Sequence, residues 1–590
     1  MSPTITLAMI VRNEAKNLAC CLESVKTDVD EIIIVDTGST DQTREIAARY
    51  TDKIYHYTWN GDFSAARNFA IGKSSGEWIL SLDADEFLDS GCGSLRDCIA
   101  DNDLAEFVFL PLRYMHAEQN IFTYDQFLIL RLFRNLPQYR FAGAIHEQLI
   151  IPCAETKRVA RYPVIWHQAT PLTERNKKRN RNVRLLKKAC ANEPDNLYLK
   201  YYLGIEWLGF GKIADALPLF KAVCDGLPAE HVLFRAPAVS HYVLCLRHED
   251  RPDEALAVCI KECKQYSEYT DLFFDAGSIL AEQGEYQQAI SWFNTAVAKG
   301  KPPLEFVHTH GVESFLAYDH LGHCHEASGD VKSAEYYYRQ AFQSNNEYTD
   351  CLLHLFFLQF NYLDPDQLYN YFRELGCYRS GRQTQFLGAL FLMAGLPAWA
   401  AACYEEFPDP GISSGRIKSM VFGGEFSKAA VMLNIARQKQ VPLSFEAELY
   451  EMVAAMLAEE YTHAHKLALT MWRTPAKRSA ALAVLLLLSK CTAVIGTVKP
   501  EEHREPEIAQ TLLVILDGCL LFREKDNGAS RLVYTRYVNL AEKTLQALMT
   551  MTAAGCMVLS PYLKQKSQQV YRLLTTKLKA DAVGCFYHEE

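Results

Sequence analysis

The feature that most constrains the fold of this chain is a short apolar run, Trp78–Leu82, that ends abruptly in the carboxylates of Asp83, Asp85 and Glu86. A bulky run of this kind predicts a buried strand of a parallel sheet. Because side chains alternate along a strand, we expect Asp83 and Asp85 to project to the same side at its carboxyl end. Open α/β sheets bind ligands there, and two such carboxylates would suit a Mg²⁺ or Mn²⁺ shared with substrate phosphates. Taken alone, an Asp-Ala-Asp string is more often an ordinary polar turn, so the residues before it decide between a turn and a metal site.

Two apolar runs upstream have the same form. Ile5–Val11 and Glu31–Asp36 predict buried strands, each followed by a helical pattern, and this alternation is typical of a doubly wound α/β domain. Asp36 closes the second strand, where a carboxylate can accept hydrogen bonds from ribose hydroxyls or a base edge. Gly38 allows a tight turn, and Ser39 is explained by capping of the next helix. No local turn or helix cap explains Asp36 in the same way.

A further strand is predicted over 54–57, followed by a turn and a helix over 60–70. We expect Ser64 to cap this helix, which places Arg67 and Asn68 three and four residues after the cap. From there the two side chains could reach a diphosphate or a sugar, although a solvated helix face explains them equally well.

Four motifs occur together in the order and spacing found in family 2 glycosyltransferases. They are Met9-Ile10-Val11-Arg12-Asn13-Glu14, Ile34-Val35-Asp36-Thr37-Gly38-Ser39-Thr40-Asp41, Phe63-Ser64-Ala65-Ala66-Arg67-Asn68 and Leu82-Asp83-Ala84-Asp85-Glu86. The chain most resembles the bacterial branch in which the catalytic domain is fused to tetratricopeptide repeats, the branch that includes sublancin-type peptide S-glycosyltransferases. The resemblance covers residues 4–170 well and the repeats more loosely. It implies an α/β GT-A domain that binds a nucleotide-diphosphosugar, followed by an all-α superhelix.

The same resemblance implies roles for the motif residues. Asp36 would hold uridine or ribose, Asp83 the ribose, and Asp85 the Mn²⁺ or Mg²⁺ that bridges the diphosphate and stabilises the departing nucleotide. Asp83 and His167 would be further candidate ligands of the metal. The donor site would also include the other residues of these motifs, namely Val11, Asn13, Glu14, Gly38, Ser39, Arg67, Asn68 and Ala84.

His167 follows a short strand predicted over 164–167. As a neutral imidazole it could complete the metal or diphosphate shell, and a structural histidine is an equal alternative. The branch usually carries a Gly-Tyr soon after this histidine, whereas Gln168-Ala169-Thr170 stands here.

The acceptor side is predicted to follow two more strands, over 107–113 and 127–133. The segment Tyr139–Gln148 resembles the Ile-His-Glu segment of the branch. Inverting transfer needs a general base that takes the proton of the acceptor. Glu147 is the first choice, with His146 as an alternative base or as a group that orients it. The structural alternative is a hydrogen-bonded pair in a loop that closes the domain.

A basic stretch then connects two regions of different character. Residues 174–188 carry eight lysines and arginines against a single acid. A solvated helix between two domains is the usual explanation of such a run. The sharper alternative is a helix that borders the donor diphosphate or steers an acidic acceptor.

From about residue 198 the sequence shows helical patterns with a recurring code of small and aromatic residues. Leu203-Gly204, Trp207, Gly211, Ala216, Phe220 and Pro228 follow the tetratricopeptide order, and related units contain Gly277, Gly322 and Gly388. Weaker units run through Ala429 and Ala464. Such repeats stack into a superhelix whose faces bind peptides or form a homodimer.

The whole chain of 590 residues is therefore predicted to comprise a GT-A domain (1–172), a basic connector (173–197), helical repeats (198–475) and a helical capping region (476–590). The net charge of −10 argues against a general nucleic-acid binder. We expect a cytoplasmic protein, because the sequence shows neither a leader nor an apolar run long enough to cross a membrane. The 18 scattered cysteines favour reduced thiols over a zinc site.

The predicted function is a metal-dependent, inverting glycosyltransferase that moves a sugar from a UDP-sugar to a protein or peptide presented by the repeats. One alternative is an enzyme of the same chemistry that builds a surface polysaccharide or a lipid-linked glycan. The other is a non-catalytic repeat scaffold.

Overall fold

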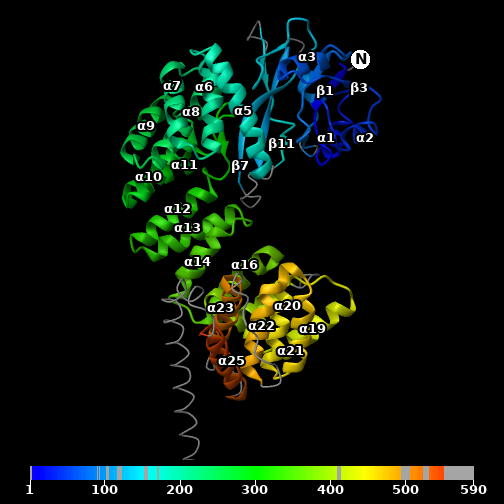
Figure 1. The fold of residues 1–590 in the computed structure, drawn as a ribbon. Coiled ribbons are helices and arrows are strands. Elements are labelled where there is room, and N and C mark those ends of the chain that lie inside the picture. The colour runs from blue at the N-terminus through cyan, green and yellow to red at the C-terminus, as the bar shows by residue number, and fades with distance from the viewer. Residues whose placement is uncertain are drawn as a thin grey trace, which may run out of the picture. The chain divides into compact units, whose positions relative to one another are not determined.

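A computed structural model describes residues 3–89, 91, 93–100, 105–115, 123–151, 157–168, 172–407, 413–492, 505–521 and 531–549. The chain divides into two compact units, 1–351 and 352–590 (Figure 1). Each unit is described by itself. Ala169 and Thr170, which follow the predicted strand at His167, and much of the capping region predicted over 476–590 lie outside the described residues.

The first unit is built on one mixed sheet. Among the described residues its strand order is β3-β2-β1-β4-β7-β6-β11-β5, with β10 beside β6 and β12 beside β7. Strands β3, β2, β1 and β4 are parallel, and β7 is antiparallel to both β4 and β6. The strands are β1 (Ile5–Val11), β2 (Glu31–Asp36), β3 (Ile54–His56), β4 (Trp78–Leu80), β5 (Glu86–Leu88), β6 (Phe107–Met115), β7 (Tyr124–Arg134), β10 (Lys157–Val159), β11 (Ile165–His167) and β12 (His308–Thr309). A separate hairpin pairs β8 (Phe141–Ala142) with β9 (Gln148–Leu149).

Helices cover both faces of the parallel half of the sheet. The side chains of Leu7 and Met9 join a core with Leu22, whereas Ala8 between them joins the opposite core with Ile71. This burial on both faces explains the nearly continuous apolar runs of the parallel strands. The helices of the sheet domain are α1 (Leu18–Val25), α2 (Thr43–Ala47), α3 (Phe63–Ile71) and α4 (Leu95–Ala100).

The strand predicted over Trp78–Leu82 ends earlier than expected. Strand β4 stops at Leu80, and Asp83 and Asp85 lie in the turn that leads to β5, so strand alternation does not set their directions. Within this turn the backbone N–H of Glu86 donates to the carbonyl of Asp83 at 3.0 Å. The carboxylate of Glu86 in return accepts from the N–H of Asp83 at 3.0 Å, which closes the turn.

Helical pairs follow the sheet in the same unit, and the basic helix α5 lies between the sheet and the first of them (Figure 1). These helices are α5 (Leu172–Asn192), α6 (Leu197–Gly209), α7 (Ile213–Gly226), α8 (Val232–His248), α9 (Pro252–Gln265), α10 (Thr270–Glu282), α11 (Tyr286–Lys299), α12 (Phe315–Ala327) and α13 (Val331–Ser344).

Small residues allow the two helices of a repeat to approach closely, as the repeat code predicts. A Cβ on Gly204 would lie 2.9 Å from the ring of Phe220, and a Cβ on Gly277 would lie 2.8 Å from the ring of Phe293. Gly322 faces Tyr338 in the same way. The glycine and the aromatic residue of the code therefore form one packing contact, and the all-α repeat architecture is confirmed.

The repeats also contact the sheet directly. Strand β12, in the segment between α11 and α12, pairs antiparallel with β7, with His308 opposite Gln126 and Thr309 opposite Asp125. The hydroxyl of Thr309 donates to the Asp125 carboxylate at 2.8 Å. The repeat region therefore contributes a strand to the mixed sheet of the first unit.

The second unit is helical throughout its described part. Helix α14 (Asp350–Phe360) spans the boundary between the units. The further helices are α15 (Pro365–Glu374), α16 (Gly381–Met393), α17 (Pro397–Glu406), α18 (Ser414–Phe422), α19 (Phe426–Gln438), α20 (Phe445–Leu457), α21 (Tyr461–Trp472), α22 (Arg478–Cys491), α23 (Glu505–Leu521) and α25 (Arg531–Met549), with short 3₁₀ helices at Cys377–Arg379 and Pro475–Lys477. In the part of the chain that is described, no helix is both long and apolar enough to cross a membrane.

Candidate functional site

Loops at the carboxyl edge of β1 and β2 form the first wall of the site. Asp36 is buried at the end of β2, and its carboxylate accepts from the backbone N–H of Ser39 at 3.0 Å. Asn13, after β1, accepts from the N–H of Thr40 at 2.7 Å, while its own N–H donates to the Ser39 hydroxyl at 3.0 Å. Gly38 has a φ of +104°, which suits this tight turn. The two loops are thus locked together beside Val11.

Asp83 lies between two buried arginines. Its Oδ1 is 2.6 Å from Nη2 of Arg67, and its Oδ2 is 2.7 Å from Nη2 of Arg131. Burial would raise the pKa of Asp83, but the two guanidinium groups outweigh it and hold this pKa well below the usual range. Asp83 is therefore a fixed carboxylate anion. Arg131 also pairs with Glu86, a carboxylate whose pKa burial raises.

Arg67 connects this network to the hairpin that carries the predicted base. Its Nε donates to Oε1 of Glu147, and its Nη1 donates to the Ser81 hydroxyl at 3.1 Å. The cap of helix α3 is Asp62 rather than the predicted Ser64, because the Asp62 carboxylate accepts from the N–H of Ala65. The Ser64 hydroxyl donates to Asp62 instead.

Asn68 fixes the same hairpin through both ends of its amide. Its Nδ2 donates to the carbonyl of Phe141 at 2.8 Å, and its Oδ1 accepts from the N–H of Phe141 at 2.8 Å. In the structure Arg67 and Asn68 thus face protein groups on β8, in the loop between β8 and β9, and in the turn after β4.

His146 and Glu147, at the end of the β8–β9 hairpin, lie against the first repeat helix. The imidazole of His146 stacks on the ring of Tyr202, with 4.0 Å between ring centroids and an interplanar angle of 8°. Its Nε2 is 3.7 Å from Oε1 of Glu206. Tyr202 and Glu206 both belong to α6, so the repeats form one wall of the site.

Asp85 and His167 meet at the other side of the site. Oδ2 of Asp85 is 3.6 Å from Nε2 of His167 and 3.1 Å from Nζ of Lys178 on α5. Nζ of Lys178 is also 3.9 Å from Oε1 of Glu14. Burial opposes the charge of Lys178, but Asp85 and Glu14 outweigh it and raise the pKa of this lysine. Lys178 of the basic connector therefore lies beside Asp85 and Glu14, and a role of the connector at the donor diphosphate stays a prediction.

The donor set around Asp85 suits a divalent cation shared with a substrate. Nδ1 of His167 is 2.9 Å from the carbonyl oxygen of Gln168, which can only accept, so this nitrogen carries the proton. Nε2 of His167 faces Asp85 at 3.6 Å, and as the nitrogen opposite the hydrogen-bonded one it is the candidate metal ligand of this ring. Among the residues described, no group of three or more histidine, cysteine or acidic side chains could hold a metal. One carboxylate and one imidazole fit Mg²⁺ or Mn²⁺ when phosphate oxygens and water supply the other ligands.

Four residues of the site were not predicted from the sequence. Arg131 stands alone as a charge within an apolar strand, and such a residue needs a buried partner, which is a signal in the sequence. Lys178 lay within the basic run without being singled out. Tyr202 and Glu206 look like ordinary repeat positions, and the sequence carries no sign of their contact with His146.

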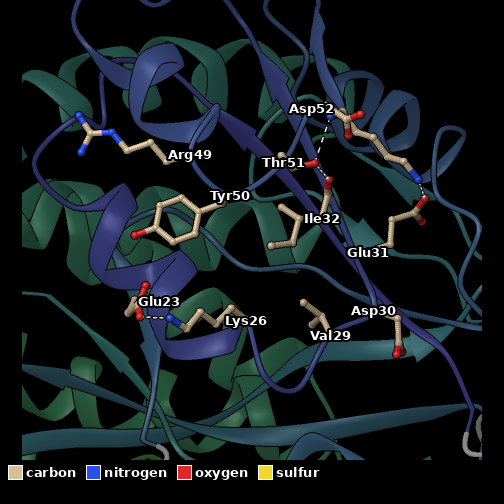
Figure 2. A pocket seen from close by; sticks show the side chains of 11 residues that line it. Glu23, Lys26, Val29, Asp30, Glu31, Ile32, Arg49, Tyr50, Thr51 and Asp52 are labelled. Carbon is tan, nitrogen blue, oxygen red and sulfur yellow. Dashed lines mark hydrogen bonds and ion pairs between the residues drawn. The ribbon is translucent and has the colours of Figure 1, made fainter.

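A hollow elsewhere on the sheet domain is not part of this site. It has a volume of about 710 Å³ and lies at the amino end of β2, opposite the end where Asp36 stands. Two ion pairs line it, and Figure 2 shows one of them, with Lys26 directed toward Glu23. Lys53 pairs with Glu31 in the same hollow.

Part of the sheet domain matches a known protein family. Residues 6–104 match the model of Glycosyl transferase family 2. Over 144 residues the chain is 43% identical to a TPR repeat-containing protein of Synechococcus elongatus, which covers 24% of this chain and 34% of that protein. Over 241 residues it is 28% identical to the SPbeta prophage-derived glycosyltransferase SunS of Bacillus subtilis, with coverage of 37% and 53%. Over 84 residues it is 40% identical to an uncharacterized glycosyltransferase of Rickettsia felis, with coverage of 14% and 29%. The chain spans between about a third and about half of the length of these relatives.

Proposed function

We propose that this chain, in which a family 2 glycosyltransferase domain is fused to tetratricopeptide-like repeats, transfers a sugar from a nucleotide diphosphate-sugar to a protein or peptide side chain. The observation that carries the proposal is the convergence of Asp36, Asp83, Asp85 and His167 from three separate segments at one edge of the sheet. That edge is where open α/β sheets bind their ligands. A UDP-sugar is the donor we assign.

The donor would lie between the loops after β1 and β2 and the turn after β4. Asp36 is placed to accept hydrogen bonds from the uridine or ribose, beside Val11 and Asn13. Asp83 is a pre-oriented anion because two guanidinium groups hold it, and hydrogen bonding to ribose hydroxyls is the role that suits such a group.

Asp85 and His167 would hold Mn²⁺ or Mg²⁺. When bound, the cation would offset the charge that develops on the departing nucleoside diphosphate. Asp83 is less suited to this task than Asp85, since both of its oxygens already accept from guanidinium groups. Lys178, which now faces Asp85, would be a second positive charge near the diphosphate.

Glu147 is the base we assign, taking the proton of the acceptor as its oxygen or sulfur attacks the anomeric carbon and the bond to the diphosphate breaks. Arg67 binds Oε1 of Glu147 and so leaves Oε2 as the oxygen for the proton. The outcome at the anomeric carbon would be inversion, because attack and departure take place on opposite faces in one step.

The acceptor is assigned to the repeats because those before residue 352 belong to the same compact unit as the sheet and contact the site through α6. Tetratricopeptide-like helices stack into surfaces that bind peptides. An enzyme that builds a polysaccharide or a lipid-linked glycan is the second candidate, and the same chemistry at the sheet supports it.

The test is donor hydrolysis and transfer by the purified full chain. Turnover of a panel of sugar nucleotides should require a divalent cation and should fall by about 10²-fold or more in Asp85→Ala. UDP with Mn²⁺ should raise the melting temperature of the wild type. Unchanged turnover after EDTA treatment and in Asp85→Ala would refute the metal assignment. Intact-mass analysis of candidate peptides would separate a peptide acceptor from a glycan.

A further inference from the structure

We propose that helix α6, the first helix of the repeats, is a working part of the active site, with Tyr202 and Glu206 as positioning residues for the loop that carries His146 and Glu147. This inference rests on the proposed function, because it takes that loop as the source of the base. It goes further in assigning part of the catalytic geometry to the repeat region rather than to the sheet domain.

The loop is anchored in a hydrophobic cluster that the sheet does not supply. Ile145, immediately before His146, is 3% exposed and packs with Val183 and Leu186 of α5 and with Leu203 of α6. Burying a side chain of this size contributes about 1.5–3 kcal/mol. The loop is therefore docked on the connector and the first repeat helix.

The backbone of His146 shows that its surroundings hold it in place. Its φ is +47°, in the left-handed region that a residue with a Cβ rarely adopts. Such a conformation costs on the order of 1–3 kcal/mol and persists only where neighbouring groups determine it. The flat stacking of the imidazole on Tyr202, at 4.0 Å, is the contact that can do so.

Glu206 presents a buried carboxylate to the same imidazole. It is 6% exposed, and its Oε1 accepts from the amide of Asn182 at 2.6 Å and lies 3.7 Å from Nε2 of His146. That Nε2 is buried and has no hydrogen-bond partner among the described residues. Tyr202 and Glu206 are four residues apart and so project from one face of α6, where together they enclose the ring of His146.

Glu147 is consequently fixed from two directions. Arg67 of the sheet domain binds its carboxylate, and α6 fixes the residue before it. A displacement of about 1 Å in a catalytic group can lower a rate by about 10²-fold. The repeats thus set the position of the base in addition to any role in binding the acceptor.

The experiment compares four variants of the full chain. Tyr202→Leu and Glu206→Gln remove the stacking and the carboxylate, and Tyr202→Phe retains the stacking. Tyr198→Leu is the matched control, since its ring packs on Phe234 within the repeats and its hydroxyl lies 3.0 Å from Nδ1 of His231. Amide hydrogen exchange of the peptide Phe141–Leu149, UDP affinity, and donor turnover are measured for each.

We expect faster exchange of Phe141–Leu149 and a turnover about 10- to 100-fold lower in Tyr202→Leu, with UDP affinity within about twofold of wild type. Glu206→Gln should change both readouts in the same direction by a smaller factor. Tyr198→Leu should exchange like the wild type in this peptide. Tyr202→Phe keeps the stacking and loses only the hydrogen bond of the Tyr202 hydroxyl with Gln148, so its exchange should be slower than that of Tyr202→Leu.

Two results would overturn the inference. Wild-type exchange of Phe141–Leu149 in both Tyr202→Leu and Glu206→Gln would show that α6 does not hold the loop. Equal losses in Tyr202→Leu and Tyr198→Leu would show a general loss of stability. If the wild type turns over no donor, the proposed function fails, and the exchange data still decide whether α6 positions the loop.

Discussion

Replacing Arg67 with methionine tests the charge network at the centre of the site. Arg67 is 6% exposed and neutralises two carboxylates, those of Asp83 and Glu147. Removing one partner of a buried ion pair costs about 3–5 kcal/mol, because it leaves an unpaired buried charge. Arg131 still binds Oδ2 of Asp83, so we expect a loss near the lower end, about 3 kcal/mol. That is a large share of the roughly 5–15 kcal/mol by which a domain is stable.

The pH dependence of this loss has a definite sign. Burial acts to raise the pKa of Asp83, but Arg67 and Arg131 outweigh it and depress that pKa in the folded wild type. A carboxyl with a depressed folded-state pKa stabilises the fold above its unfolded-state pKa of about 3.9, and this stability is lost as the pH falls through the folded-state value. The difference in unfolding free energy between wild type and Arg67→Met should therefore be full above about pH 5 and shrink below it.

The assay is urea unfolding of the full chain, followed by circular dichroism at several pH values, with the transition of the first unit analysed. Arg134→Met is the control, because the Arg134 guanidinium lies over the ring of Trp78 at 5.0 Å and donates to the carbonyl of Ala105. Its loss should be about 1 kcal/mol and nearly independent of pH. A loss below about 1 kcal/mol for Arg67→Met at pH 7.5, or a difference that grows toward low pH, would refute the reasoning.

Two further predictions concern the connector and the repeats. Lys178→Ala should raise the donor KM about twofold to fivefold, as suits a half-exposed cation, and the effect should shrink in 0.5 M salt; steady-state kinetics at low and high salt measure this. Gly277→Ala should destabilise the repeats by about 1–3 kcal/mol, because the added Cβ would lie 2.8 Å from the ring of Phe293. In urea unfolding, Phe293→Leu combined with Gly277→Ala should cost less than the sum of the single losses, and strict additivity would contradict this contact.

Sequence patterns predicted the strands correctly where the run of buried residues has the same bounds as the strand. Ile5–Val11 and Glu31–Asp36 are strands over the predicted residues, because both of their faces are covered by helices. The strand at Trp78 was predicted too long for a related reason. Leu82 and Ala84 are buried, at 0% and 5% exposure, yet they lie in the turn beyond β4. An apolar run indicates that its residues are buried, and the sequence of a buried turn cannot be distinguished from that of a buried strand.

The motif residues lie at the carboxyl edge of the sheet, and the family model over residues 6–104 confirms the resemblance that they suggested. Their partners depend on contacts between distant segments, which local patterns do not encode. Arg131 is separated from Asp83 by 48 positions, and Glu206 is 60 positions beyond His146. The roles assigned to Asp36, Asp85, Glu147 and His167 remain predictions, and Asp85→Ala tests the metal role directly.

The two carboxylates of the Asp-Ala-Asp turn differ in how easily a ligand can replace their partners. Asp83 is held by arginines whose side chains are 7% and 10% exposed, so its partners are part of the core. Asp85 faces Lys178, whose side chain is 46% exposed and can move into solvent at little cost. Under the proposed function, a divalent cation arriving with a diphosphate would displace Lys178 from Asp85, whereas displacing Arg67 and Arg131 from Asp83 would leave buried charges unpaired. Asp83 is thus the carboxylate with fixed partners and Asp85 the one with an exchangeable partner, and we propose Asp85 as the ligand of a metal that would enter and leave with the substrate.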